Sequence, residues 1–184
     1  GLLTKQVPVC IRTMALPGRE EARALIMAEF EDYIYCCTHL SLTEEDRMTS
    51  LNMIKDFAAS VQKPFFLAGD MNAEPQSDFI KGLQKDFQIL SNPKVPTFPA
   101  PKPKETLDYI VTLKNNAKGF AAIPSKVLDE PVASDHRPLV VTLRTAEKTE
   151  KIFRTKPYLQ NPVGNGITVM WETTVPAYCW VEYG

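Results

Sequence analysis

The stretch PFFLAGDMN, residues 64–72, decides the fold class of this chain. Its first part, 64–68, is a short apolar run without a polar residue, which is typical of a strand covered on both faces. Asp70 and Asn72 follow directly, and polar residues at the end of such a strand lie at the rim of its sheet. The stretch therefore predicts a buried strand that ends in polar groups at one edge of the sheet.

Strands and helices are expected to alternate around this strand. Thr43 precedes three acidic residues and an apolar pattern of helical spacing, which predicts an amphipathic helix over 44–61. Ser77 is expected to cap a second helix, and residues 92–104, with five prolines, to form a loop. The other expected strands are 7–14, 22–30, 33–40, 107–113 and 138–143, while the apolar stretch 120–128 is less regular. This alternation indicates an α/β or α+β layered fold.

The composition changes after Arg144. A polar and charged linker is expected there, followed by a segment with an all-β pattern. Alternating strands are expected at 167–171, after the turn pair Asn165 and Gly166, and at 178–183. Because two or three strands do not close a β-sandwich, this tail is expected to belong to something larger or to depend on a partner. The expected organisation is a first domain over 1–144, a linker over 145–156 and an incomplete second domain over 157–184.

Composition and charge exclude several classes of protein. With 184 residues, of which 44% are hydrophobic, the chain has enough apolar material for a buried core. The 21 basic and 22 acidic residues give a net charge of -1, so no global positive field attracts nucleic acid or anionic lipid. The 4 cysteines are too few and too irregularly spaced for a disulfide scaffold or paired zinc knuckles. The apolar runs are all shorter than the roughly 18 residues that a transmembrane segment needs.

Both histidines, His39 and His136, stand beside polar residues at expected strand ends. Asp70 and Asn72 end the buried strand and Asp108 begins another, so a layered sheet is expected to gather these groups at one rim. Oxygen donors favour Mg²⁺, Mn²⁺ or Ca²⁺ over zinc, and carboxylates around such a cation with two imidazoles suit hydrolysis of a phosphate ester. The sequence has neither a Gly-x-Ser-x-Gly elbow nor a phosphate-binding glycine loop, which argues against a serine hydrolase and a P-loop nucleotide triphosphatase.

Each of these signatures, taken alone, also has a plain structural explanation. A glycine and an aspartate at a strand end fit a turn, and Asp135 beside His136 fits a structural hydrogen bond. Arg47 is expected to be a solvated helix residue or a member of a structural ion pair. Three further basic residues are either contacts to substrate phosphate or surface charges: Lys102, Lys104 and Arg137.

Four motifs follow one another in an order that a known family shares. They are Thr38-His39-Leu40 with Arg47 in the following helix, Gly69-Asp70-Met71-Asn72-Ala73 with Pro75, Thr97-Phe98-Pro99-Ala100 ahead of Leu107-Asp108-Tyr109-Ile110, and Ser134-Asp135-His136-Arg137-Pro138-Leu139. Each motif alone is a weak signal, but four in order are specific. Over about residues 1–144 the chain resembles the endonuclease/exonuclease/phosphatase superfamily. The resemblance implies part of a four-layered α/β sandwich with its active site at one rim.

The resemblance also implies a role for each site residue. Asp70 corresponds to the residue that positions or activates the attacking water, and Asn72 to a donor to the phosphate or a neighbour of the metal. His136 corresponds to the imidazole that contacts the scissile phosphate, and Asp108 to the carboxylate that orients this imidazole. His39 corresponds to the second histidine, which stabilises the transition state or protonates the leaving oxygen. The implied ligands of a Mg²⁺ or Mn²⁺ ion are Asp135, Asp70 and Asn72.

The chain departs from the family pattern at its start. The family also needs a metal-binding glutamate and a nearby asparagine in the N-terminal half of its domain, and this chain opens at a point that resembles the middle. No acidic residue precedes Glu20, and Glu20 and Glu21 come too late in the order to be assigned as ligands. The missing N-terminal half of the domain is thus an expected partner. We expect weak metal binding and little or no activity from the chain alone.

The tail resembles a different family. Residues 153–162, 167–171 and 181–184 are similar to the start of the fibronectin-like N-terminal domain of purple acid phosphatase-type metallophosphoesterases. This resemblance implies a parent protein that joins two phosphoesterase modules, and a secreted or envelope-associated location in a bacterium.

Two functions fit these observations. The first is a divalent-metal-dependent phosphoesterase that hydrolyses a phosphodiester or a phosphomonoester by metal-assisted attack of water. A small phosphorylated or lipid-like substrate is favoured over nucleic acid, because tight binding to duplex DNA needs several phosphate contacts from basic residues. The second is a non-catalytic binding or scaffolding module that keeps the fold.

Overall fold

The computed structural model describes residues 1–114, 116, 119–145 and 153–173 of the chain. The chain forms two compact units, Gly1–Thr145 and Ala146–Gly184, and each is described by itself. Neither described helix combines the length and the apolar character that crossing a membrane requires.

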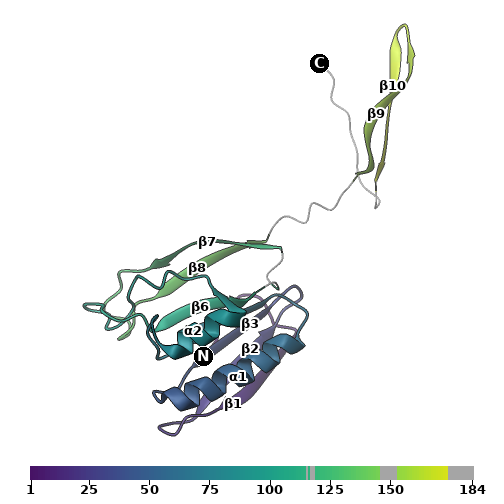
Figure 1. Ribbon diagram of the computed structural model, residues 1–184. Coiled ribbons are helices and arrows are strands. Elements are labelled where there is room, and N and C mark those ends of the chain that lie inside the picture. The colour runs from purple at the N-terminus through teal and green to yellow at the C-terminus, as the bar shows by residue number, and fades with distance from the viewer. Residues whose placement is uncertain (115, 117–118, 146–152, 174–184) are drawn as a thin grey trace. The chain divides into compact units, whose positions relative to one another are not determined.

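A mixed six-stranded sheet forms the centre of the first unit (Figure 1). Its strands are β1 (Cys10–Leu16), β2 (Arg23–Glu29), β3 (Ile34–His39), β4 (Phe65–Asp70), β5 (Phe87–Ile89) and β6 (Asp108–Leu113), in the spatial order β1-β2-β3-β4-β6-β5. β4 runs parallel to β3 and antiparallel to β6. The ends of β3 and β4 and the start of β6 therefore meet at one rim of the sheet.

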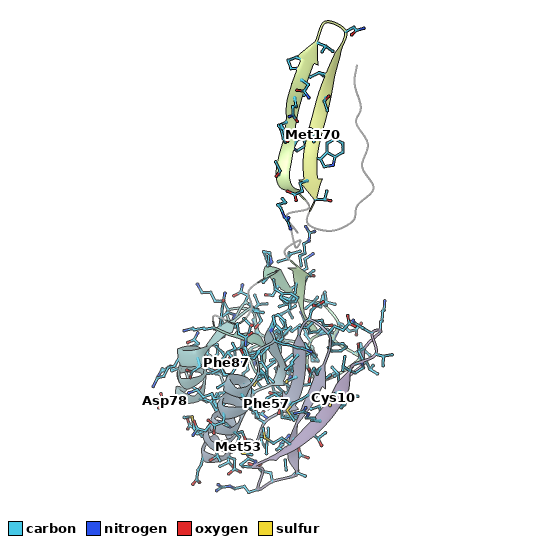
Figure 2. All side chains as sticks on the ribbon, turned by 90° about the vertical axis from the view of Figure 1, so that its right-hand side faces the viewer. Cys10, Met53, Phe57, Asp78, Phe87 and Met170 are labelled. Atoms are coloured by element: carbon cyan, nitrogen blue, oxygen red, sulfur yellow. The ribbon has the colours of Figure 1, made fainter. Side chains whose placement is uncertain are left out.

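Two helices, α1 (Glu44–Ser60) and α2 (Asp78–Asp86), cover one face of this sheet (Figure 1). Apolar side chains fill the space between the helices and the sheet, as the sticks in Figure 2 show. Phe57 of α1 and Phe87 of β5 both contact the ring of Phe65, at centroid distances of 6.0 and 6.1 Å. The helix residues buried in this core are Leu51, Ile54, Ala58, Phe79, Ile80 and Leu83.

The sequence predicts both helices closely, because their local signals agree with their packing. α1 begins at Glu44, as predicted, and ends one residue before the predicted end. α2 follows Ser77, whose Oγ accepts a hydrogen bond from the Ile80 N–H at 3.3 Å. Among the strands, β1 begins at Cys10 rather than at residue 7. The predicted α/β (α+β) fold class is confirmed.

A separate two-stranded sheet, β7 (Phe120–Val127) with β8 (Leu139–Thr145), completes the described part of the first unit. It lies over the sheet face that the helices leave free (Figure 1), where the Phe120 ring contacts Phe66 at a centroid distance of 5.1 Å. No strand was predicted over β7, because Pro124 and a register shift between Ile123 and Lys126 break its alternation. Strand β5, also not predicted, has only 3 residues.

The second unit contains one described hairpin, formed by β9 (Phe153–Val163) and β10 (Gly166–Thr173). The predicted strand at 167–171 lies within β10. β9 begins at Phe153, so the strand starts inside the range expected to be a linker. The predicted strand at 178–183 and Cys179 lie outside the described residues.

The described cysteines, Cys10, Cys36 and Cys37, are free thiols. Cys36 is fully buried in the core between the sheet and the helices, and burial raises the pKa of its thiol to about 12. Cys36 therefore packs as a small apolar side chain rather than as a reactive thiol.

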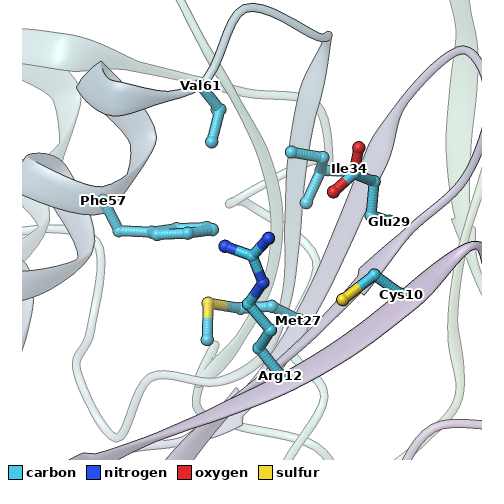
Figure 3. Close-up of a pocket in the computed structure, with 7 residues that line it drawn as sticks. All are labelled: Cys10, Arg12, Met27, Glu29, Ile34, Phe57 and Val61. Atoms are coloured by element: carbon cyan, nitrogen blue, oxygen red, sulfur yellow. The ribbon is translucent and has the colours of Figure 1, made fainter.

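A small cavity lies on the helix side of the sheet, at the end of the strands opposite the rim described above. Its lining includes Arg12, Glu29 and Phe57, and Figure 3 shows the Arg12 guanidinium beside the Phe57 ring. Its volume of about 30 Å³ has room for no more than about two water molecules. The cavity is therefore a packing gap and is separate from the groups at the rim.

Candidate active site

Three of the predicted site residues stand at the ends of neighbouring strands. His39 is the last residue of β3, Asp70 the last of β4 and Asp108 the first of β6. The strand register pairs His39 with Asp70 and Asp70 with Asp108. Parallel pairing of β3 with β4 and antiparallel pairing of β4 with β6 thus bring the three side chains to one rim.

His136 joins these residues from the loop that precedes β8. Its Nδ1 lies 2.7 Å from Asp108 Oδ2, and its Nε2 lies 3.7 Å from Asp70 Oδ2. The same Asp70 oxygen lies 3.4 Å from His39 Nε2. One carboxylate oxygen therefore stands between two imidazoles, and a second carboxylate orients one of them.

The environment shifts the pKa of two of these groups. Burial raises the pKa of the Asp70 carboxyl, and the nearby Asp108 charge adds to this, against the opposing effects of the Asn72 N–H and the two imidazoles. Burial lowers the pKa of His136, but the Asp108 hydrogen bond and the charges of Asp108, Asp70 and Asp135 raise it above the ordinary value. Asp70 is therefore a stronger base than an exposed aspartate, and His136 holds its proton more tightly than an exposed histidine.

These contacts predict the titration of His136. In metal-free protein, its pKa is expected to lie above the ordinary value of 6.5, and Asp108→Asn is expected to lower it because the hydrogen-bonding carboxylate is lost. The ion pair between His136 and Asp108 contributes its full stabilisation at pH values below the unfolded-state pKa of His136. This stabilisation is lost as the pH rises through the folded-state pKa. An NMR titration of ¹⁵N-labelled imidazoles in EDTA measures both variants. An equal pKa of His136 in the two proteins would contradict the arrangement.

Asn72 stabilises the rim through one backbone and one side-chain hydrogen bond. It has a φ of 46°, its N–H donates to Asp70 Oδ1 at 2.8 Å, and its Nδ2 donates to Leu40 O at 2.8 Å. Asn72 thus links the end of β4 to the residue after His39. The second hydrogen of the Asn72 amide is left for the predicted donation to a phosphate.

Asp135 does not join the central cluster in the described part of the chain. Its side chain is exposed, and its carboxylate accepts a hydrogen bond from Ser134 Oγ at 3.2 Å. The ligand atoms that lie within 4.8 Å of one another belong instead to Asp70, Asp108 and His136. Two carboxylates and an imidazole are a donor set that fits a divalent cation. Asp108, predicted only to orient His136, is therefore also placed to contact a cation.

Arg47 and Glu20 have structural roles. Arg47 is buried, and its Nη1 donates to the carbonyl oxygens of Ser41 and Leu42 at 3.0 and 2.7 Å. It is thus not a solvated residue, and no ion pair of Arg47 occurs among the described residues. Glu20 accepts hydrogen bonds from Ser41 and Thr43, which hold it at the start of α1. Glu20 therefore lies outside the cluster of Asp70, Asp108 and His136.

The ring of Phe98 was given no role by sequence reasoning, yet it packs against His136. The two ring centroids are 4.8 Å apart, with an angle of 42° between the planes. Its place in the third sequence motif was the available signal. Beyond His136, a cavity of about 350 Å³ extends past Asp108 and Arg137 to the sheet residues Ala68 and Ile110.

The sequence model of the endonuclease/exonuclease/phosphatase family matches residues 9–136. The chain belongs to this family. The match covers the described sheet, both helices and all four groups of the rim. The predicted family membership is thus confirmed. No curated protein matches the chain.

Solved structures share the fold of this family member. One is a functionally unknown conserved protein from Enterococcus faecalis, with 22% identity, a TM-score of 0.62 and coverage of 75% of this chain and 66% of that one. Another is a mannosyl-6-phosphatase from Bacteroides thetaiotaomicron, with 15% identity, a TM-score of 0.60 and coverage of 74% and 66%. The catalytic domain of human Nocturnin with a bound sulfate anion has 20% identity, a TM-score of 0.57 and coverage of 75% and 59%. The chain thus spans 59–66% of the length of these structures, less than two thirds of each.

Proposed function

We propose that this chain is part of a divalent-metal-dependent phosphoesterase. The observation that carries the proposal is the position of Asp70 Oδ2, 3.4 Å from His39 Nε2 and 3.7 Å from His136 Nε2, with Asp108 bound to the far side of His136. A base between two imidazoles, beside a carboxylate-rich cation site, is the set of groups that hydrolysis of a phosphate ester needs. Family membership supports the same reaction class.

Each residue has a defined task in this proposal. Asp70 orients the attacking water and takes its proton, a task that suits its raised pKa. Asp108 holds the proton of His136 on Nδ1, so that Nε2 faces the phosphate. His39 donates a proton to the leaving oxygen. A bound Mg²⁺ or Mn²⁺ would be held by Asp70 and Asp108, with Asn72 beside Asp70, and would offset the phosphate charge.

We propose a small phosphorylated or lipid-like substrate, with nucleic acid as the second class to test. The net charge of -1 supports this order, because duplex DNA requires a surface rich in Lys and Arg. One solved neighbour is described as a mannosyl-6-phosphatase, which is a precedent on this fold for a small substrate.

Two further parts of the proposal concern the rest of the protein. The first is that a metal-binding glutamate comes from an N-terminal half of a four-layered domain, so that residues 1–184 bind metal weakly. The resemblance of the chain's start to the middle of the family's domain supports this. The second is that 157–184 begins a fibronectin-like domain, which the β9–β10 hairpin supports.

The test combines metal binding with turnover. When Mn²⁺ is added to the chain, the NMR resonances of Asp70, Asp108 and His136 are expected to broaden first, because their ligand atoms cluster within 4.8 Å. Slow hydrolysis of bis(p-nitrophenyl) phosphate is expected to require Mg²⁺ or Mn²⁺ and to stop with EDTA. Asp70→Asn is expected to remove both signals, whereas Asp78→Asn, with a carboxylate that is 82% exposed, leaves both unchanged.

The outcomes separate the enzyme from the scaffold. Fast hydrolysis by residues 1–184 alone would overturn the proposal of a missing ligand but not that of a phosphoesterase. Absence of both broadening and hydrolysis, also in a form that carries the N-terminal half of the domain, would favour the non-catalytic module.

A further inference from the structure

Two segments of the chain are joined on either side of His136. The Arg137 N–H donates to Thr97 O at 2.8 Å, and the Ala100 N–H donates to Asp135 O at 2.7 Å. The residues directly before and after His136 are therefore both fixed to the same loop. Since a short backbone segment held at both ends has little freedom to rotate, the Cα–Cβ direction of His136 depends on this loop.

The side chain of Arg137 adds two more connections. Its Nε–H donates to Ala100 O at 2.7 Å, and its Nη2 lies 3.0 Å from Asp129 Oδ1. The Arg137 side chain is 22% exposed, whereas that of Asp129 is 85% exposed. The bond to Ala100 is thus shielded from water, while the ion pair with Asp129 is weakened by it. Nε and Nη2 of the Arg137 guanidinium are therefore both paired with groups of this chain.

The loop held in this way carries Phe98. The Phe98 ring packs on the His136 imidazole at a centroid distance of 4.8 Å, and Phe98 is fixed from behind by paired backbone hydrogen bonds with Glu105 at 2.9 and 3.0 Å. Asp108 binds Nδ1 of the same imidazole. With one face packed by Phe98 and one edge held by Asp108, the imidazole is held with Nε2 directed to Asp70.

We propose that Arg137 is a positioning residue for His136: it locks the Phe98 loop against the imidazole. Arg137 acts through Ala100 and Phe98 and does not contact substrate. Arg137 is then neither of the two things that its sequence allowed, a contact to substrate phosphate or a surface charge. The kinetic part of this inference rests on the proposed function, whereas its structural part does not.

The proposal predicts a specific kinetic effect of Arg137→Gln. Glutamine is too short to reach Ala100 O and Asp129 together, so the Phe98 loop is expected to move away from His136. A catalytic group displaced by about 1 Å loses roughly tenfold to a hundredfold in rate. We therefore expect kcat to fall by about that factor for bis(p-nitrophenyl) phosphate with Mn²⁺, and KM to change less than about twofold. A phosphate-binding arginine would raise KM instead, and that result would overturn the proposal.

A spectroscopic measurement tests the same point without turnover. In Arg137→Gln, the ¹⁵N and ¹H shifts of the His136 imidazole are expected to change, while those of His39 stay in place. Asp129→Asn keeps the shielded bond to Ala100 and is expected to leave both sets of shifts within error. Lys55→Gln, which breaks the Lys55–Asp86 ion pair between α1 and α2, is the control for loss of a half-buried cation.

The outcomes distinguish this inference from the proposed function. Shifted His136 signals in a protein without any hydrolysis would support the positioning role and count against the phosphoesterase. Unshifted His136 signals with a lowered kcat would refute the positioning role and leave the phosphoesterase intact. If Arg137→Gln does not fold, Phe98→Leu is expected to give the same shifts of His136, and their absence would refute the role.

Discussion

Replacing His136 by alanine is expected to lower the rate of metal-dependent phosphate-ester hydrolysis by about a thousandfold, within the range seen when a hydrogen-bond donor to the transition state is removed. His136 is the group through which Asp108 acts, because Asp108 Oδ2 contacts its Nδ1 at 2.7 Å. The variant removes the imidazole that faces the phosphate in the proposed mechanism. It also leaves the Asp108 carboxylate without its histidine partner.

The measurement is kcat/KM for bis(p-nitrophenyl) phosphate with saturating Mg²⁺, in the form of the protein that gives the highest activity. Asp108→Asn is expected to lose less, by about a hundredfold, because the imidazole is still present but its tautomer is no longer fixed. In the double variant, the loss is expected to be much smaller than the product of the two single losses, since Asp108 acts mainly through His136. Additive losses, or a His136→Ala variant with unchanged turnover, would refute the assigned roles.

Gly69→Ala is expected to destabilise the fold by about 3–5 kcal/mol, which is exceptional for the addition of one methyl group. Gly69 has a φ of +151°, and a Cβ built on it would lie 1.9 Å from Thr38 O. Gly69 pairs with Thr38 in the parallel ladder between β3 and β4, so the methyl group meets backbone that the ladder holds in place. Either the two strands separate or the backbone of β4 before Asp70 changes its conformation.

The measurement is the free energy of unfolding from urea denaturation. Gly82→Ala is the matched control, because its Cβ would lie 3.4 Å from the nearest atom, Leu51 Cδ2, at a helical position with ordinary φ. Alanine favours a helix over glycine, so this control is expected to gain about 0.5–1 kcal/mol. If Gly69→Ala lowers the free energy of unfolding by less than about 1 kcal/mol, β3 and β4 can adjust to the added methyl group and the prediction is wrong.

The central strand and the cluster at its end could be predicted because their signals are local. The apolar run before Gly69 and the polar residues after it identify a buried strand and its rim, and Ser77 identifies the start of α2. The relation between Asp108 and Asp135 could not be predicted from spacing. Asp135 is adjacent to His136 in sequence but exposed, whereas Asp108 reaches the imidazole through strand pairing.

Other features depend on contacts between distant segments. Pro124 interrupts the strand pattern of β7 in the sequence. The strand forms because β8 pairs with it and because Phe120 packs on the main sheet. The hydrogen bond from Arg137 to Ala100 joins residues 37 positions apart. The local sequence around either residue contains no pattern that predicts this bond. Long-range pairing therefore decides the geometry around His136, while local pattern decides the sheet.

The position of His136 in the chain sets the order in which the site is completed during synthesis. All six strands of the main sheet lie between Cys10 and Leu113, so the ribosome has made the whole sheet before it reaches residue 136. At about 5–20 residues per second, the last group of the cluster follows Leu113 by roughly one to five seconds. The strands that carry His39, Asp70 and Asp108 are thus synthesised before the imidazole that completes the cluster. Along the chain, the strands of the scaffold precede the residue that completes the cluster.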